Sequence, residues 1–168
     1  MAKKLIFIWL LSLLTWAFVL PAQATLTVEI TKNVASALPI AIPSFGPGIA
    51  GQPSVADVVR NDLRHSGLFR VIDPAGYPGD PRAPSDVKAA DWTTVGATGL
   101  AVGSVEPLNG GYVVNVYVYN VSTGQELTAH RFTCSAAELH MTAHHVADVI
   151  YKAFTGKPGP VSYTHLRA

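Results

Sequence analysis

The sequence predicts an α/β fold in which a mixed sheet of about five strands packs against two main helices. Segments with apolar residues at alternate positions are interleaved with two segments whose apolar residues recur every three or four positions. Residues 99–134 read as three successive strands joined by turn signals, which predicts a meander. Strands that alternate with helices and then follow one another are typical of helices layered against one face of a sheet.

Three strand-like segments precede this meander. Thr25–Thr31 is rich in β-branched residues and alternates in polarity, and Leu38–Pro43 and Leu68–Asp73 are short apolar runs. The loop Ser44–Gly51 (SFGPGIAG) contains three glycines and a proline and follows the second of them. These segments predict two or three further strands.

A first main helix is predicted over residues 54–65. Ser54 is expected to cap its first turn, and Gly67 is expected to end it. Arg60 and Arg64 fall on the side opposite the apolar stripe and are expected to be exposed. The stripe consists of Val55, Val58, Val59 and Leu63, with Asp62 as its polar interruption.

The second half of the chain contains a weaker helix, the meander and the second main helix. The weaker helix is predicted over Ser85–Val95, and Asn109-Gly110 predicts a tight hairpin. Ser135 and Glu138 have the spacing of a capping box, and Gly156 is expected to end the helix that follows. The apolar stripe of that helix is Leu139, Ala143, Val146, Ile150 and Phe154. The predicted strands of the meander are Gly99–Glu106, Tyr112–Asn120 and Gln125–Cys134.

Residues 1–24 have the three parts of a secretory signal peptide. Lys3 and Lys4 precede an apolar run from Leu5 to Leu20, and Ala22-Gln23-Ala24 has the small-x-small pattern of a cleavage site. A spanning helix needs about 20 apolar residues, and this run is shorter. We therefore expect cleavage after Ala24, a periplasmic location and no membrane insertion of the mature chain.

The charge of the chain argues against nucleic-acid binding, and its cysteine content excludes disulfides within the chain and multi-cysteine zinc sites. Two of the twelve Lys and Arg residues lie in the leader, which leaves ten against eleven Asp and Glu, a net charge near −1. A nucleic-acid-binding domain usually carries a strong positive charge. The single cysteine, Cys134, allows no disulfide within the chain and no multi-cysteine zinc site, and we expect it to be buried.

No residue pattern points to an enzyme or to a cofactor. Ser44 and Ser66 lack the G-x-S-x-G context of a nucleophile, and Ser66 is interpreted as part of a helix terminus. His140 and His144 have i, i+4 spacing, which suits zinc, with His130 or Asp148 as an arguable third ligand. We interpret the histidine pair as facing solvent, and predict no metal site, no cofactor and no catalysis.

The segments LPIAIPSFGPG (38–48) and VADVVRNDLRHSGLFRVID (55–73) resemble the N-terminal domain of the TolB family, the periplasmic component of the Tol–Pal system. Further matches are AADWTTVGATGLAVGSV, NGGYVVNVYVYNVSTGQEL and HMTAHHVADVIYKAFTGKPG, so the resemblance covers residues 25–159. It implies a TolB N-terminal α/β domain that acts as a protein–protein adaptor and supports outer-membrane integrity and invagination during cell division. The family's β-propeller is missing, and residues 160–168 (PVSYTHLRA) form an unrecognised tail, interpreted as a possible artefact.

The resemblance also implies the partners. The family uses its mature N-terminal segment for TolA and its propeller for Pal, so this chain is expected to keep only the TolA surface. The predicted TolA-binding residues are Thr25, Leu26, Thr27, Val28, Glu29, Ile30, Thr31, Lys32 and Asn33. Because this segment is β-prone, it is expected to add to TolA as a strand. The alternative is that Thr25–Thr31 pairs within the sheet of its own domain.

Two other functions remain open from the sequence. Similar α/β domains form rings in envelope secretion or motor assemblies, and helices on a small mixed sheet also occur in anticodon-binding modules. The near-neutral charge and the export signal argue against the nucleic-acid-binding alternative.

Overall fold

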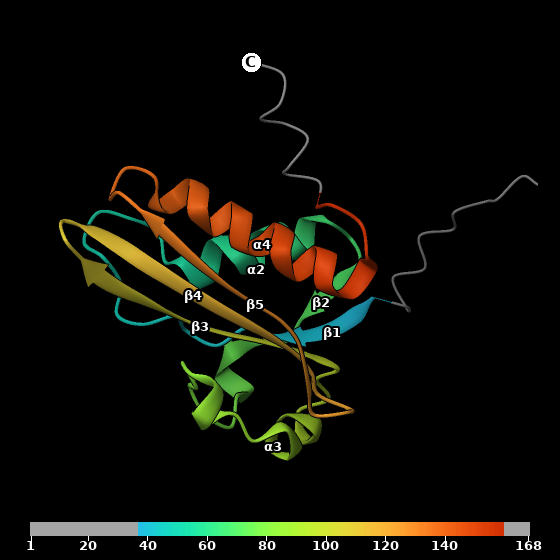
Figure 1. Ribbon diagram of the computed structural model, residues 1–168. Helices are drawn as coiled ribbons and strands as arrows, with labels where there is room; N and C mark the ends of the chain where they lie inside the picture. Colours follow the sequence, from blue (N-terminus) through green and yellow to red (C-terminus); the bar gives the residue numbers. More distant parts are fainter. Residues whose placement is uncertain (1–36, 160–168) are drawn as a thin grey trace, which may run out of the picture. The chain divides into compact units, whose positions relative to one another are not determined.

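A computed structural model describes residues 37–159, which form one mixed five-stranded sheet with helices on both of its faces (Figure 1). The strands lie in the order β2-β1-β3-β4-β5. They are β1 (Leu38–Ala41), β2 (Phe69–Val71), β3 (Gly99–Leu108), β4 (Gly111–Asn120) and β5 (Gln125–Cys134). The predicted mixed sheet is confirmed.

Strand β1 is the only described strand with parallel neighbours on both sides. Leu38 pairs with Phe69 of β2, and Ile40 pairs with Gly99 of β3. Strands β3, β4 and β5 form the predicted antiparallel meander. At its first turn Asn109 and Gly110 have φ angles of 47° and 82°, the left-handed conformations that an Asn-Gly hairpin requires.

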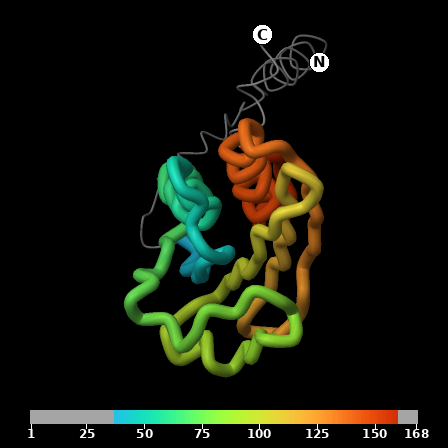
Figure 2. Tube along the Cα trace, turned by 90° about the vertical axis from the view of Figure 1, so that its left-hand side faces the viewer, coloured from blue at the N-terminus to red at the C-terminus, as the bar shows by residue number. Residues whose placement is uncertain are grey.

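The two main helices, α2 (Val55–His65) and α4 (Leu139–Thr155), lie side by side on one face of the sheet (Figures 1 and 2). The valines at alternate positions of β4 point into this layer and have no exposed surface. The core between helices and sheet contains Ile40, Ile42, Phe45, Val59, Leu63, Val114, Val116, Val118, Leu139, Val146 and Ile150.

The helix ends agree with the predicted stops, but the predicted caps differ in detail. Gly67 and Gly156 follow α2 and α4 with φ angles of 71° and 69°. Ser54 is the N-cap of α2, yet its side chain makes no capping hydrogen bond. Before α4, the carboxylate of Glu138 accepts hydrogen bonds from the backbone N–H and the hydroxyl of Ser135. The first of these is one of the two hydrogen bonds of the predicted capping box.

Side chains from residues 72–98 cover the opposite face of the sheet (Figure 1), so the expectation that helices lie against one face alone is wrong. The helix predicted over residues 85–95 is also shorter than expected, because η3 (Pro84–Asp86) interrupts it and only α3 (Ala89–Thr94) is α-helical. The carboxylate of Asp86 accepts hydrogen bonds from the backbone N–H groups of Arg82 and Ala83 and so stabilises that turn.

This second layer has its own small core. Trp92 of α3 is only 2% exposed and packs edge-on against Tyr77, with ring centroids 5.2 Å apart. Tyr77 follows η2 (Pro74–Gly76). On the sheet side, this core contains Ala41, Leu100, Val102 and Tyr119. Tyr119 is therefore buried under this second layer.

The predicted leader (1–24), the strand Thr25–Thr31 and the tail (160–168) lie outside the described residues. Among residues 37–159, none of the helices combines the length and the apolar character that a membrane crossing requires.

Candidate protein-protein interface

The predicted TolA-binding segment, residues 25–33, also lies outside the described residues. The described chain begins at Ala37 and continues directly into β1. Strand β1 is held within the sheet, since the N–H of Leu38 donates to the carbonyl of Leu68 and the N–H of Ile72 donates to the carbonyl of Ile40. Strand β1, which begins five positions after the last residue of the predicted binding segment, is therefore fixed in the sheet.

Within the described residues, β5 forms a long edge of the sheet. Most of its side chains are exposed, and Leu127 is 37% exposed. A groove of about 710 Å³ lies along β5 and α4, and apolar, basic and acidic side chains line it. Members of the lining include Phe132, His145, Val149, Lys152 and Ala153. An edge strand beside such a groove has the features that accept an added peptide strand.

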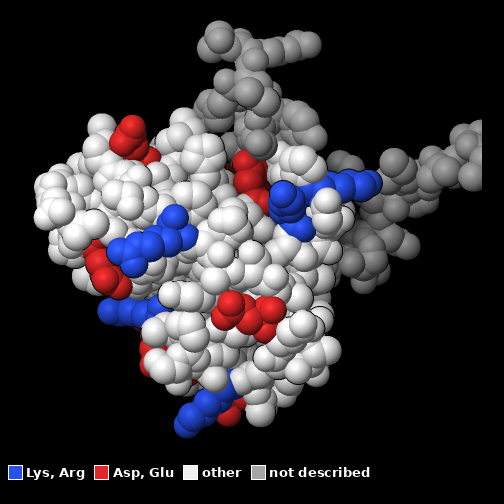
Figure 3. Space-filling view, in the orientation of Figure 1, with Lys and Arg blue, Asp and Glu red and all other residues white. Residues whose placement is uncertain are grey.

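Charge is distributed without one dominant sign on the face drawn in Figure 3. Lys and Arg side chains lie between Asp and Glu side chains, and white, uncharged surface separates them (Figure 3). This pattern agrees with the near-zero net charge of the sequence and differs from the continuous basic surface that nucleic-acid-binding domains present.

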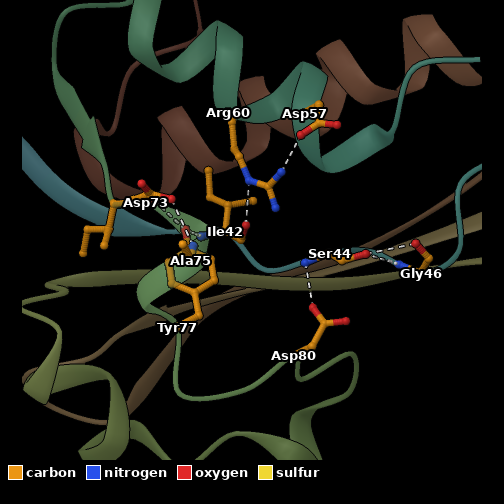
Figure 4. Close-up of polar contacts among 10 residues, drawn as sticks. Ile42, Ser44, Gly46, Asp57, Arg60, Asp73, Ala75, Tyr77 and Asp80 are labelled. Carbon is orange, nitrogen blue, oxygen red and sulfur yellow. Dashed lines mark hydrogen bonds and ion pairs between the residues drawn. The ribbon is translucent and has the colours of Figure 1, made fainter.

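The loop after β1 is anchored from both faces of the sheet (Figure 4). Arg60 of α2 donates from Nε to the carbonyl of Ile42 over 2.9 Å and pairs with Asp57. From the other layer, the hydroxyl of Tyr77 accepts a hydrogen bond from the N–H of Ile42 at 2.9 Å. The carboxylate of Asp80 accepts from the N–H of Ser44 at 2.8 Å. The loop therefore joins the two layers.

The hydroxyl of Tyr77 also donates to the carbonyl of Ile72 at 2.9 Å. Burial is the main reason why the pKa of the Tyr77 phenol lies above its usual value. The phenol thus stays protonated and keeps this donor at neutral pH.

The expectation that Arg60 is exposed is wrong, whereas Arg64 is exposed as expected. Arg60 is only 9% exposed because its guanidinium lies between α2 and the loop and donates to the buried carbonyl of Ile42 (Figure 4). A buried carbonyl needs a donor, and an arginine has enough reach to supply one from the helix above. Arg60 therefore belongs to the anchor of the loop and is not available as a binding surface.

Replacing Arg60 with alanine is expected to lower the free energy of unfolding by about 1–3 kcal/mol, since it leaves a buried carbonyl without its donor. Arg64→Ala is the matched control on the same helix, and its cost is expected to stay within about 0.5 kcal/mol. Urea unfolding followed by circular dichroism measures both. Equal effects of the two changes would show that Arg60 does not anchor the loop.

The histidine pair is not simply solvent-facing. His140 is exposed, but His144 is partly buried, and its Nδ1 lies 2.6 Å from Oδ2 of Asp62 on α2. In the sequence, Asp62 stands out as the polar interruption of an apolar stripe. A carboxylate in that position indicates a hydrogen-bonding partner on the neighbouring element, which here is His144. His130 and Asp148 do not join the pair, and among residues 37–159 no group of three or more His, Cys, Asp or Glu side chains is placed to hold a metal ion.

The two serines considered as nucleophiles make local structural hydrogen bonds. Ser44 donates from its hydroxyl to the carbonyl of Gly46, and Ser66 donates to the carbonyl of Leu63 at the end of α2. Ser66 is thus part of the helix terminus, as predicted. Cys134 is buried at the end of β5, as expected.

The sequence is similar to that of a known protein family. The model of the TolB amino-terminal domain family matches residues 26–127. The Tol-Pal system protein TolB of Nitrosospira multiformis is 36% identical over 88% of this chain and 34% of that protein. The TolB protein of Methylococcus capsulatus is 35% identical over 81% of this chain and 32% of that protein. The chain therefore spans about a third of the length of these relatives.

A solved structure supports the same assignment. The crystal structure of TolB from Acinetobacter baumannii superposes with a TM-score of 0.64 and 28% sequence identity, over 73% of this chain and 29% of that chain. The family model, the relatives and the solved structure all confirm the resemblance inferred from the sequence motifs. The chain belongs to the TolB family of the Tol-Pal system and contains its amino-terminal domain.

Proposed function

We propose that this chain is a periplasmic protein–protein adaptor of the Tol–Pal system, and that it supports outer-membrane integrity and invagination during cell division without catalysing a reaction. The observation that carries the proposal is the family match, which extends over most of the α/β domain. The signal-peptide pattern of residues 1–24 supports export, with Thr25 as the first residue of the mature protein.

The partner in this proposal is TolA, and the binding residues are Thr25–Asn33. The β-prone character of the segment favours addition as a strand, in which main-chain hydrogen bonds give affinity and alternate side chains give specificity. Strand β1 is held in the sheet by its own hydrogen bonds, so the proposal assigns TolA binding to residues that precede it in the sequence and not to β1 itself.

Pal is expected to bind this chain weakly or not at all. In the TolB family the Pal surface belongs to the propeller, and the residues described here form only the α/β domain. We include no cofactor and no nucleic acid in the proposal.

Deleting residues 25–33 is expected to abolish binding to the C-terminal domain of TolA and to leave the α/β domain folded. Both the undeleted chain and the deletion variant are purified from the periplasm, and mass spectrometry of the undeleted chain is expected to find Thr25 as its first residue. Isothermal titration calorimetry then compares TolA binding by the undeleted chain and by the deletion variant. Circular dichroism checks that the deletion variant is folded. Binding by the deletion variant at full strength would place the TolA site elsewhere in the chain.

A further inference from the structure

Three side chains from the two main helices form a continuous polar row. Asp62 lies on α2, and His140 and His144 lie one turn apart on α4. Oδ2 of Asp62 is 2.6 Å from Nδ1 of His144, and Nε2 of His144 is 3.3 Å from Nε2 of His140. The row therefore connects a partly buried carboxylate to an exposed imidazole.

The carboxylate sets the orientation of the first imidazole. An ionised carboxylate only accepts hydrogen bonds, so Nδ1 of His144 carries the proton in this contact. In the neutral ring, Nε2 of His144 then presents its lone pair, and it points toward His140. A carboxylate that holds a histidine in this way is the usual outer partner of a metal-binding imidazole.

The separation of the two Nε2 atoms matches a shared metal ion. Zinc binds imidazole nitrogen at about 2.0–2.1 Å, and tetrahedral geometry then puts two such nitrogens about 3.3–3.4 Å apart. The observed separation is 3.3 Å, and the two rings are inclined at 78° with centroids 4.7 Å apart. Asp62 contacts the far side of the His144 ring, so it orients that ligand and does not itself reach the ion.

We propose that His140 and His144 chelate a divalent transition-metal ion, with zinc as the best geometric match and Asp62 as the positioning residue. Two protein ligands leave two tetrahedral positions for water, in keeping with the exposure of His140. The site therefore takes an exchangeable ion. Since His144 is bonded to Asp62 of α2, an ion held on α4 also reinforces the contact between the two helices.

Calorimetric titration with ZnCl₂ tests the proposal on the full chain, purified without a polyhistidine tag. The wild type and His145→Ala are expected to bind one zinc ion saturably and to unfold at a higher temperature with zinc present. His140→Ala is expected to lose both effects. His145 is the matched control because it is the exposed histidine next to His144 on the same helix.

Asp62→Asn tests the positioning role separately. It keeps both imidazoles, and it is expected to weaken zinc binding by about 10- to 100-fold, as loss of an outer partner usually does. Unchanged zinc affinity in this variant would remove Asp62 from the site. Absence of saturable zinc binding by the wild type, or equal zinc binding by His140→Ala, would overturn the proposal. The contact between the two imidazoles would then be an N–H···N hydrogen bond.

Discussion

Replacing Ile150 with alanine is expected to lower the free energy of unfolding by about 2–5 kcal/mol, the range for large-to-small changes in a packed core. Ile150 has no exposed surface and lies in the core that α4 shares with α2 and the sheet. The alanine leaves a cavity there, because the neighbouring helix and the sheet limit how far the site can collapse.

Met141→Ala is the control on the same helix. Met141 is 37% exposed, so its replacement is expected to cost about 0.5 kcal/mol or less. Urea unfolding of both variants, followed by circular dichroism, gives the comparison. If Ile150→Ala cost no more than Met141→Ala, α4 would not pack on the sheet as described.

Replacing Leu26, Val28 and Ile30 together with serine is expected to weaken binding to the C-terminal domain of TolA much more than changes at Thr27 and Glu29 do. Alternate residues of an extended strand share one face, so these three apolar side chains would enter the partner together. Their replacement removes the specificity contacts and leaves only the main-chain hydrogen bonds.

Changes on the other face of the segment serve as the control. Thr27→Ser and Glu29→Gln alter side chains that would face away from TolA, and they are expected to retain most of the binding. Isothermal titration calorimetry measures both sets. Equal losses on the two faces would show that the segment does not bind as an extended strand.

The parts of the fold that follow local rules were predictable from the sequence. The hairpin at Asn109-Gly110 depends on two residues that tolerate positive φ angles, and both adopt them. Helix α4 depends on one apolar stripe and a glycine stop, and four of the five predicted stripe residues are fully buried or nearly so. The alternating valines of β4 likewise identified the face that the main helices cover.

Features that depend on distant partners were not predictable. The exposure of Arg60 was misjudged because its acceptor, the carbonyl of Ile42, lies on a different element. His144 was assigned to solvent because Asp62, its partner, is 82 positions away in the sequence. The helix expected over residues 85–95 was interrupted by the turn at Pro84–Asp86, which a weak, partial stripe could not reveal.

One part of the candidate interface was predictable from the sequence and the other was not. Residues 25–33 were identified from a family resemblance and from β propensity, and the described residues do not include them. The groove beside β5 had no signal in the sequence, because a strand and a helix brought together by the fold line it from two sides. The sequence predicted β5 as a strand but gave no indication that a groove lies beside it.

Transfer of the segment tests the central claim most directly. Residues 25–33 are fused to the N-terminus of an unrelated, soluble carrier, and binding to the C-terminal domain of TolA is measured by isothermal titration calorimetry. The carrier alone and a carrier with a scrambled segment are the controls. We predict that the fusion binds TolA and that both controls do not. A fusion that fails to bind, together with a deletion variant that still binds, would contradict the assignment of the TolA site to Thr25–Asn33.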